Sequence, residues 1–332
     1  MLESSKSRPA SRQLPASRRR WSLPVQALVN WPHPSGLNRV TLWQNTAPFG
    51  PARIDQATHN EIVSFLWGIA DDVLRDLFRR GKYADVILPM CVLRRIDAVI
   101  QPARQKVLET KALLDSLDIT EQREALRQAA GQAFYNTSAF SLRDLRARSS
   151  RQQLEADFCA WLDGFSPNVQ DILDNFKFRN QIRTLSQADA LGMLVEKLLD
   201  PEINLTPDPV YYGDRTLRHP AMDNHSMGTI FEELVRRFNE DNNEEAGEHW
   251  TPRDAVELMA NLIFLPIADA IPSGSYTLYD GPVGTGGILT VAEETLLELA
   301  GQRGKQVVTH LYGQEINPET YAICKADMLL EG

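Results

Sequence analysis

Apolar residues recur at every third or fourth position through much of the first 200 residues, which is the spacing of one face of an α-helix. The stretch 58–78 carries such a stripe, and Gly81 is expected to end that helix. A second apolar helical region covers 85–117, with Pro89 and Pro102 expected at turns or helix ends. Two-residue alternation is almost absent here, so this part is predicted to be helical, with its stripes forming a core. The spacing predicts further helices over 119–131, 151–162, 166–176 and 186–199.

The pattern changes after residue 200. Residues 201–224 are rich in proline and aspartate and are predicted to form a linker or loop. Another helix is predicted to begin at the sequence TPRD. There Thr251 suits the N-cap, Pro252 the first helical position and Asp254 the helix dipole. Between the linker and TPRD, one amphipathic helix is predicted, with its apolar face at Ile230, Leu234, Val235 and Phe238.

Two short apolar runs, 276–280 and 307–312, are predicted to be strands, connected by a glycine-rich turn and a helix from about Ile288. Glycine is needed in such a turn because the backbone must bend tightly and let a ligand approach without a Cβ in the way. Asp280 ends the first run, and Glu315 follows the second. An acid at the end of the second strand is placed to accept hydrogen bonds from ribose hydroxyls. The pattern therefore predicts a nucleoside-cofactor site.

Three motifs together resemble one known family. They are HWTPR at 249–253, D-x-x-x-G-T-G-G at 280–287 and GQEINPETYAICKADMLL at 313–330. This combination is similar to the modification (M, HsdM-like) subunit of type I restriction-modification systems, and the resemblance runs from about Thr58 to Gly332. It implies a DNA adenine-N6 methyltransferase that uses S-adenosyl-L-methionine.

The resemblance also implies a fold of the α + α/β class, in which a helical domain precedes the start of a Rossmann-like S-adenosylmethionine-dependent methyltransferase domain. Because the chain offers only two or three strands, the sheet is expected to be incomplete. The region after about residue 270 should then be poorly stable unless a downstream segment or a partner completes the sheet. The expected divisions are a disordered basic Ser/Pro/Arg-rich extension (1–56), the helical domain (57–205), a linker (206–224) and the N-terminal portion of the methyltransferase domain (225–332).

By resemblance, the cofactor-contacting residues lie in three segments. They are Glu248, His249, Trp250, Thr251, Pro252 and Arg253, then Asp280, Gly284, Thr285, Gly286 and Gly287, and finally Glu315. Arg253 is expected to pair with the methionine carboxylate, since charge-assisted pairing is strong and directional. Asp280 is expected to meet the methionine ammonium, directly or through water. The family's usual loop has P-A-C where this chain has Gly281, Pro282 and Val283, so weaker cofactor binding is expected.

No catalytic residue is assigned. Enzymes of this family carry an N-P-P-F/Y motif downstream of the cofactor acid, and neither NPP nor DPP occurs in these 332 residues. Adenine-N6 transfer needs a flipped base that is held by stacking and by acceptors for its exocyclic amine. The cofactor half of the site is therefore expected here without the base half. The chain is expected to be truncated before that motif and inactive alone.

Composition is that of a soluble globular protein, with 43% hydrophobic and 24% charged residues. No apolar run approaches the ~20 residues that a membrane helix needs. Three widely separated cysteines favour reduced thiols in a cytoplasmic protein over disulfides or zinc. His225, His249 and His310 lack the spacing of metal ligands; His225 is expected on a loop surface, and Cys324 on the apolar side of a helix.

Charge is unevenly distributed along the chain. Residues 1–53 hold eight basic residues and one acid, so a whole-chain net charge of −9 leaves −16 for the remainder. Such an acidic body is unusual for a protein that grips DNA alone. The preferred interpretation of the basic start is a disordered extension or a mis-assigned start, with a DNA-binding arm or a targeting peptide as alternatives. The resemblance implies that DNA, a specificity subunit, a second M subunit and a restriction subunit are the partners.

Two other functions remain open. The first is a non-catalytic remnant that still docks a specificity subunit or DNA through its helical domain. The second is a nucleotide-binding oxidoreductase with a similar βαβ loop. The second is disfavoured because GPVGTGG lacks the G-x-G-x-x-G spacing, and because TPR and GQEIN have no role there.

Overall fold

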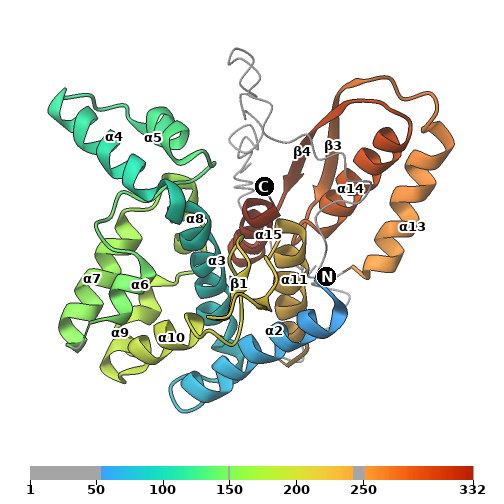
Figure 1. Cartoon of the computed structure of the whole chain (residues 1–332). Coiled ribbons are helices and arrows are strands. Elements are labelled where there is room, and N and C mark those ends of the chain that lie inside the picture. The colour runs from blue at the N-terminus through green and yellow to red at the C-terminus, as the bar shows by residue number, and fades with distance from the viewer. Residues whose placement is uncertain (1–53, 149, 242–250, 332) are drawn as a thin grey trace, which may run out of the picture.

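The computed structural model describes residues 54–331, apart from 149 and 242–250. Figure 1 shows a region of packed helices beside a small unit in which two strands are flanked by helices. No helix in the described residues is long and apolar enough to cross a membrane. The helical region contains α2 (Gln56–Ile69), α3 (Ala84–Ile100), α4 (Arg104–Ser116), α5 (Arg123–Ala130), α6 (Leu142–Arg146), α7 (Arg151–Asp163), α8 (Pro167–Asn175), α9 (Arg179–Gln187) and α10 (Ala190–Leu198).

The first helix ends earlier than predicted. The Asp55 carboxylate caps α2 by accepting a hydrogen bond from the Thr58 N–H at 2.7 Å. At Ile69 the chain passes into a π-helical turn over Ala70–Leu74, so the prediction that Gly81 ends the helix was wrong. The wider turn keeps Val73 and Leu74 buried before the chain leaves the core. A 3₁₀ turn, Arg80–Lys82, then leads to α3.

The two prolines of the second helical region behave differently. Pro102 lies in a 3₁₀ turn, Gln101–Ala103, that joins α3 to α4, as predicted for a helix end. Pro89 lies inside α3, so its predicted place at a turn or end was wrong. The surrounding residues of α3 are almost all buried. Burial of this apolar segment therefore outweighs the backbone hydrogen bond that proline removes.

The predicted helix over 186–199 is broken in two. The break falls at Ala188 and Asp189, and Asp189 has a left-handed backbone with φ of 57°. Aspartate tolerates that conformation better than most residues, so α9 ends and α10 begins there. The first of the two helices, α9, was missed because its short sequence buries only Ile182, Leu185 and Ser186.

The α/β unit confirms the predicted strand, loop, helix and strand. β3 (Gly274–Pro282) pairs in parallel with β4 (Val307–Gln314), and α14 (Gly287–Gln302) connects them. The register aligns Asp280 with Gly313, so both strands end at the same edge of the sheet. A helix before this unit, α13 (Arg253–Phe264), packs beside α14 and continues into a 3₁₀ turn over Leu265–Ile267.

A short hairpin lies in the stretch expected to be a linker. β1 (Val210–Tyr211) and β2 (Leu217–His219) pair in antiparallel fashion. The buried side chain of Asn204 donates hydrogen bonds to the carbonyls of Asp208 and Pro220, both at 2.8 Å. These bonds join the two ends of the hairpin segment to each other.

The main hydrophobic core crosses from the helical region into the C-terminal part of the chain. Its members include residues of α11 (Asn224–Asp241) and α15 (Pro318–Glu331) together with those of α2, α3 and α8. A second, smaller core lies between α13, α14 and β3. Helices α11 and α15 therefore connect the α/β unit to the helical region, and Figure 1 shows both in the centre of the molecule.

Candidate functional site

The turn between β3 and α14 requires glycine at two positions. Gly284 and Gly286 have left-handed backbones, with φ of 57° and 98°. A Cβ added at Gly286 would lie 3.0 Å from both Cys324 Sγ and Met328 Cε of α15. The Gly286 N–H donates to the Val283 carbonyl at 2.9 Å, which closes the turn one residue before α14 begins. Glycine here thus allows both the bend and the close approach of α15.

A cavity of about 310 Å³ opens beside this turn, between α11, α13, α14 and the start of α15. Its volume is at the lower end of the range for small-molecule sites. The predicted site residues that line it are Thr251, Arg253, Gly284, Thr285, Gly287 and Glu315. Residues that were not assigned as cofactor contacts from the sequence complete the lining: Phe231, Glu232, Val235, Val256, Pro282, Val283, Ile288, Val291, Asn317, Thr320, Ile323 and Asp327.

Three predicted residues described by the structure do not line the cavity: Pro252, Asp280 and Gly286. Pro252 occupies the N-cap of α13 and Arg253 is the first helical residue, so the predicted cap at Thr251 was one residue too early. Asp280 lies near the end of β3, and its buried Oδ2 accepts no hydrogen bond within the described part of the chain. Burial raises the pKa of this carboxyl group. Glu248, His249 and Trp250 lie outside the described residues.

Glu315 directly follows β4 at the edge where both strands end. Its Oε1 accepts hydrogen bonds from the backbone N–H groups of Ile316 and Asn317, each at 2.7 Å. These bonds fix the carboxylate at the cavity wall, close to the glycine turn of the neighbouring strand. The acid and the turn therefore face one space, as their positions after two parallel strands predicted.

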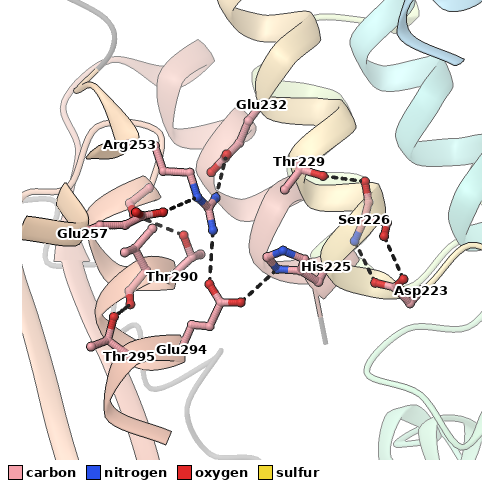
Figure 2. Close-up of polar contacts among 12 residues, drawn as sticks. Asp223, His225, Ser226, Thr229, Glu232, Arg253, Glu257, Thr290, Glu294 and Thr295 are labelled. Carbon is pink, nitrogen blue, oxygen red and sulfur yellow. Dashed lines mark hydrogen bonds and ion pairs between the residues drawn. The ribbon is translucent and has the colours of Figure 1, made fainter. Parts of the chain in front are cut away.

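Arg253 is surrounded by carboxylates from three helices. Its guanidinium contacts Glu232 of α11 at 3.3 Å, Glu257 of α13 at 3.4 Å and Glu294 of α14 at 3.1 Å (Figure 2). Burial raises the pKa of Glu232, and nearby Glu294 adds to this while Arg253 opposes it. Glu232 was not predicted as a site residue, because no local motif marks it and its partner Arg253 is 21 residues away in the sequence.

His225 belongs to the same group of side chains. Its Nδ1 lies 3.3 Å from Glu294 Oε1, and the residue lies in the first turn of α11 (Figure 2). The expectation of a loop-surface histidine was therefore wrong, since α11 begins at Asn224. Among the described residues, no group of histidine, cysteine and acidic side chains could hold a metal ion.

Cys324 lies on the face of α15 that packs on the glycine turn, which confirms its predicted place on an apolar side. Burial raises the pKa of its thiol to about 12, so it stays protonated near neutral pH. Its contribution here is therefore packing against Gly286.

Comparison with protein families identifies both halves of the chain. Residues 62–198 match the model described as HsdM N-terminal domain, and residues 222–332 match that of the N-6 DNA Methylase. The chain belongs to the HsdM-like family of type I modification subunits. The helical region followed by a methyltransferase fold is thus confirmed.

Individual relatives of this HsdM-like chain agree with that assignment. The MpnII type I methylase subunit of Mycoplasma pneumoniae is 30% identical over 105 residues, which are 32% of this chain and 18% of that protein. The HindI methylase subunit of Haemophilus influenzae is 24% identical over 125 residues, which are 38% of this chain and 24% of that protein. The matched segments thus span a quarter or less of these relatives.

A solved structure shares the fold of this HsdM-like chain. It is the type I restriction-modification system methyltransferase subunit from Streptococcus thermophilus, with a TM-score of 0.52 and 20% sequence identity. The match covers 82% of this chain and 56% of that chain.

Proposed function

We propose that this chain supplies the cofactor-binding part of a type I DNA adenine-N6 methyltransferase, and that the cavity beside the glycine turn binds S-adenosyl-L-methionine. The observation that carries this proposal is that the glycine turn and Glu315 line one cavity at the carboxyl ends of two parallel strands. Nucleoside cofactors bind at this place in α/β sheets.

The residues around the cavity fit such a cofactor, which supplies an electrophilic methyl group when bound. Glu315 would accept hydrogen bonds from the ribose hydroxyls, and the turn at Gly284–Gly287 would let the cofactor lie against the backbone. Arg253 would bind the methionine carboxylate, since it faces the cavity from the start of α13. Asp280, whose buried Oδ2 accepts no hydrogen bond in the described residues, would meet the ammonium group directly or through water. Thr251, Pro252 and the adjoining Glu248, His249 and Trp250 are proposed to complete the contacts.

The base-binding half of the reaction is proposed to come from outside these 332 residues. They contain no N-P-P-F/Y motif, and base flipping needs stacking and hydrogen-bond acceptors for adenine. We therefore propose that this chain alone binds cofactor without transferring methyl. A specificity subunit, a second modification subunit, a restriction subunit and DNA are the proposed partners, in the cytoplasm. The acidic charge of residues 54–332 supports delegation of DNA contact to a partner.

Calorimetry with S-adenosylmethionine tests the proposal, with NADH as the comparison ligand for a dinucleotide site. We expect binding of S-adenosylmethionine only. Glu315→Gln should weaken that binding about 10-fold or more, because it removes a charged acceptor for the ribose hydroxyls. Glu298→Gln makes the same chemical change on the exposed side of α14 and should leave binding unchanged.

Either of two results would count against this function. Preference for NADH would support an oxidoreductase. Failure of the chain to bind either ligand would favour a remnant that only docks a partner through its helical region.

A further inference from the structure

Glu232 forms the cavity wall that faces the start of α14. It projects from the middle of α11 and lines the cavity together with Arg253 and Gly287. A Cβ added at Gly287 would lie 3.7 Å from Glu232 Oε1, so the carboxylate lies directly over the end of the glycine turn. Figure 2 shows this carboxylate directed toward the Arg253 guanidinium. An unassigned acid is thus placed beside the segment that would hold the cofactor.

Several carboxylates share the Arg253 guanidinium. One guanidinium faces the three carboxylates of Glu232, Glu257 and Glu294, at 3.1 to 3.4 Å. These distances exceed the roughly 2.7–2.9 Å of tight charge-assisted hydrogen bonds, so the carboxylates can accept further hydrogen bonds. His225, beside Glu294, adds one positive charge only when it is protonated. Glu232 lies on the cavity side of this group and shares Arg253 with other carboxylates, so a ligand cation in the cavity would give this partly buried carboxylate a second partner.

We propose that Glu232 binds the positively charged α-ammonium group of the ligand's amino-acid end, while Arg253 binds the neighbouring carboxylate. This inference rests on the proposed S-adenosylmethionine site and names the part of that ligand which Glu232 recognises. The two side chains lie 3.3 Å apart at one cavity wall, so they present opposite charges to a zwitterion. An ammonium group has three N–H donors, so a contact with Asp280 does not compete with one to Glu232.

Three ligands separate the ammonium contact from the rest of the site. S-adenosylmethionine carries both the carboxylate and the ammonium, decarboxylated S-adenosylmethionine keeps only the ammonium, and 5′-methylthioadenosine has neither. Calorimetry on the full 332-residue chain should show that Glu232→Gln weakens binding of the first two by about 10-fold to 100-fold. Binding of 5′-methylthioadenosine should stay as in the unsubstituted protein. Arg253→Lys should weaken S-adenosylmethionine more than its decarboxylated form, because only the former presents a carboxylate to the guanidinium fork.

Glu233→Gln is the matched control. Glu233 is the next residue of the same helix, its side chain is 23% exposed against 27% for Glu232, and it pairs with Arg236 and Arg237 away from the cavity. It should keep the affinities of the unsubstituted protein for all three ligands, and thermal melts should show that each variant is folded.

The results distinguish the inference from the function on which it rests. If the unsubstituted chain binds none of the three ligands, the proposed function fails and the inference fails with it. If it binds S-adenosylmethionine and Glu232→Gln changes nothing, only the inference is overturned. Equal weakening of all three ligands by Glu232→Gln would also overturn it, because 5′-methylthioadenosine offers no ammonium, and the effect would then be structural.

Discussion

Gly284 and Gly286 share a left-handed backbone but differ in their surroundings. A Cβ at Gly284 would meet no atom within 4 Å, whereas at Gly286 it would press on Cys324 and Met328. Gly284→Ala should therefore lower the free energy of unfolding by about 1–2 kcal/mol, from backbone strain alone. Gly286→Ala should cost roughly 1 kcal/mol more, because α15 must also shift. Urea unfolding measures both values.

Gly301→Ala serves as the reference for these two substitutions. Gly301 lies in α14 with open space around it and is not among the described glycines with positive φ. Alanine there should stabilise the protein by up to about 1 kcal/mol, because it favours the helix. Equal costs at Gly284 and Gly286 would show that contact with α15 does not constrain the turn.

Residues in short motifs were predictable, and residues that act through distant contacts were not. The glycine turn and Glu315 were found because a strand, a tight turn and a strand-end acid follow one another within one βαβ unit. Glu232 gave no such signal. In the sequence it is one polar position of an amphipathic helix. Its place at the cavity depends on how α11 packs on α2, α3 and α15, which brings Glu232 within reach of Arg253 of α13.

At the scale of elements, Asp97 joins three helices. From α3 it accepts hydrogen bonds from the Leu142 N–H at the start of α6 and from Trp161 Nε1 of α7, at 3.3 and 3.2 Å. Burial raises the pKa of this carboxyl, although both hydrogen bonds and nearby Arg94 oppose the shift. The pKa of Asp97 is higher in the folded protein than in the unfolded chain. The free energy of unfolding therefore decreases as the pH rises and Asp97 ionises.

Asp97→Asn should therefore be most destabilising at low pH and less so toward neutral pH. Asparagine keeps one acceptor, but its NH₂ group faces the other N–H donor, which costs about 1–3 kcal/mol. The free energy of unfolding of the unsubstituted protein falls as Asp97 ionises, so the difference in stability between the two proteins becomes smaller. Urea unfolding at pH 4.5, 6 and 7.5 measures this trend. Asp76→Asn, at an exposed position, should stay within about 0.5 kcal/mol throughout, and a growing gap for Asp97→Asn would contradict the assignment.

Helix boundaries were predicted less well than strands, and the reasons lie in tertiary packing. β3 and β4 were found because each is a compact apolar run bounded by turn residues. The π-helical turn after α2 and the buried Pro89 in α3 contradict local propensity, since in both places burial of neighbouring apolar side chains outweighs it. The short helix α9 has too few buried residues for its sequence to show the apolar repeat of a helix.

At the scale of the whole molecule, the α/β unit depends on the helical region. Helices α11 and α15 bury their apolar faces in the main core, and Arg95 of α3 donates a hydrogen bond to Asn224 Oδ1 at 2.8 Å. On the other side, α13 leaves large apolar side chains exposed, among them Leu258, Leu262 and Ile263. The sheet of this unit has only two strands in the described residues. Neither side of this unit is therefore closed by its own residues.

Residues 220–332 expressed alone should consequently lack a cooperative thermal melt. Separation from the helical region exposes the faces of α11 and α15, and a two-stranded parallel sheet with two covering helices buries too little surface to compensate. Residues 54–241 keep α11 with most of its core partners and should melt cooperatively, at a lower temperature than the full chain because α15 is missing. Circular dichroism and calorimetry on the three proteins measure this. A sharp, two-state transition for 220–332 alone would show that the cofactor half of the site folds independently, and that the shared core is not what stabilises it.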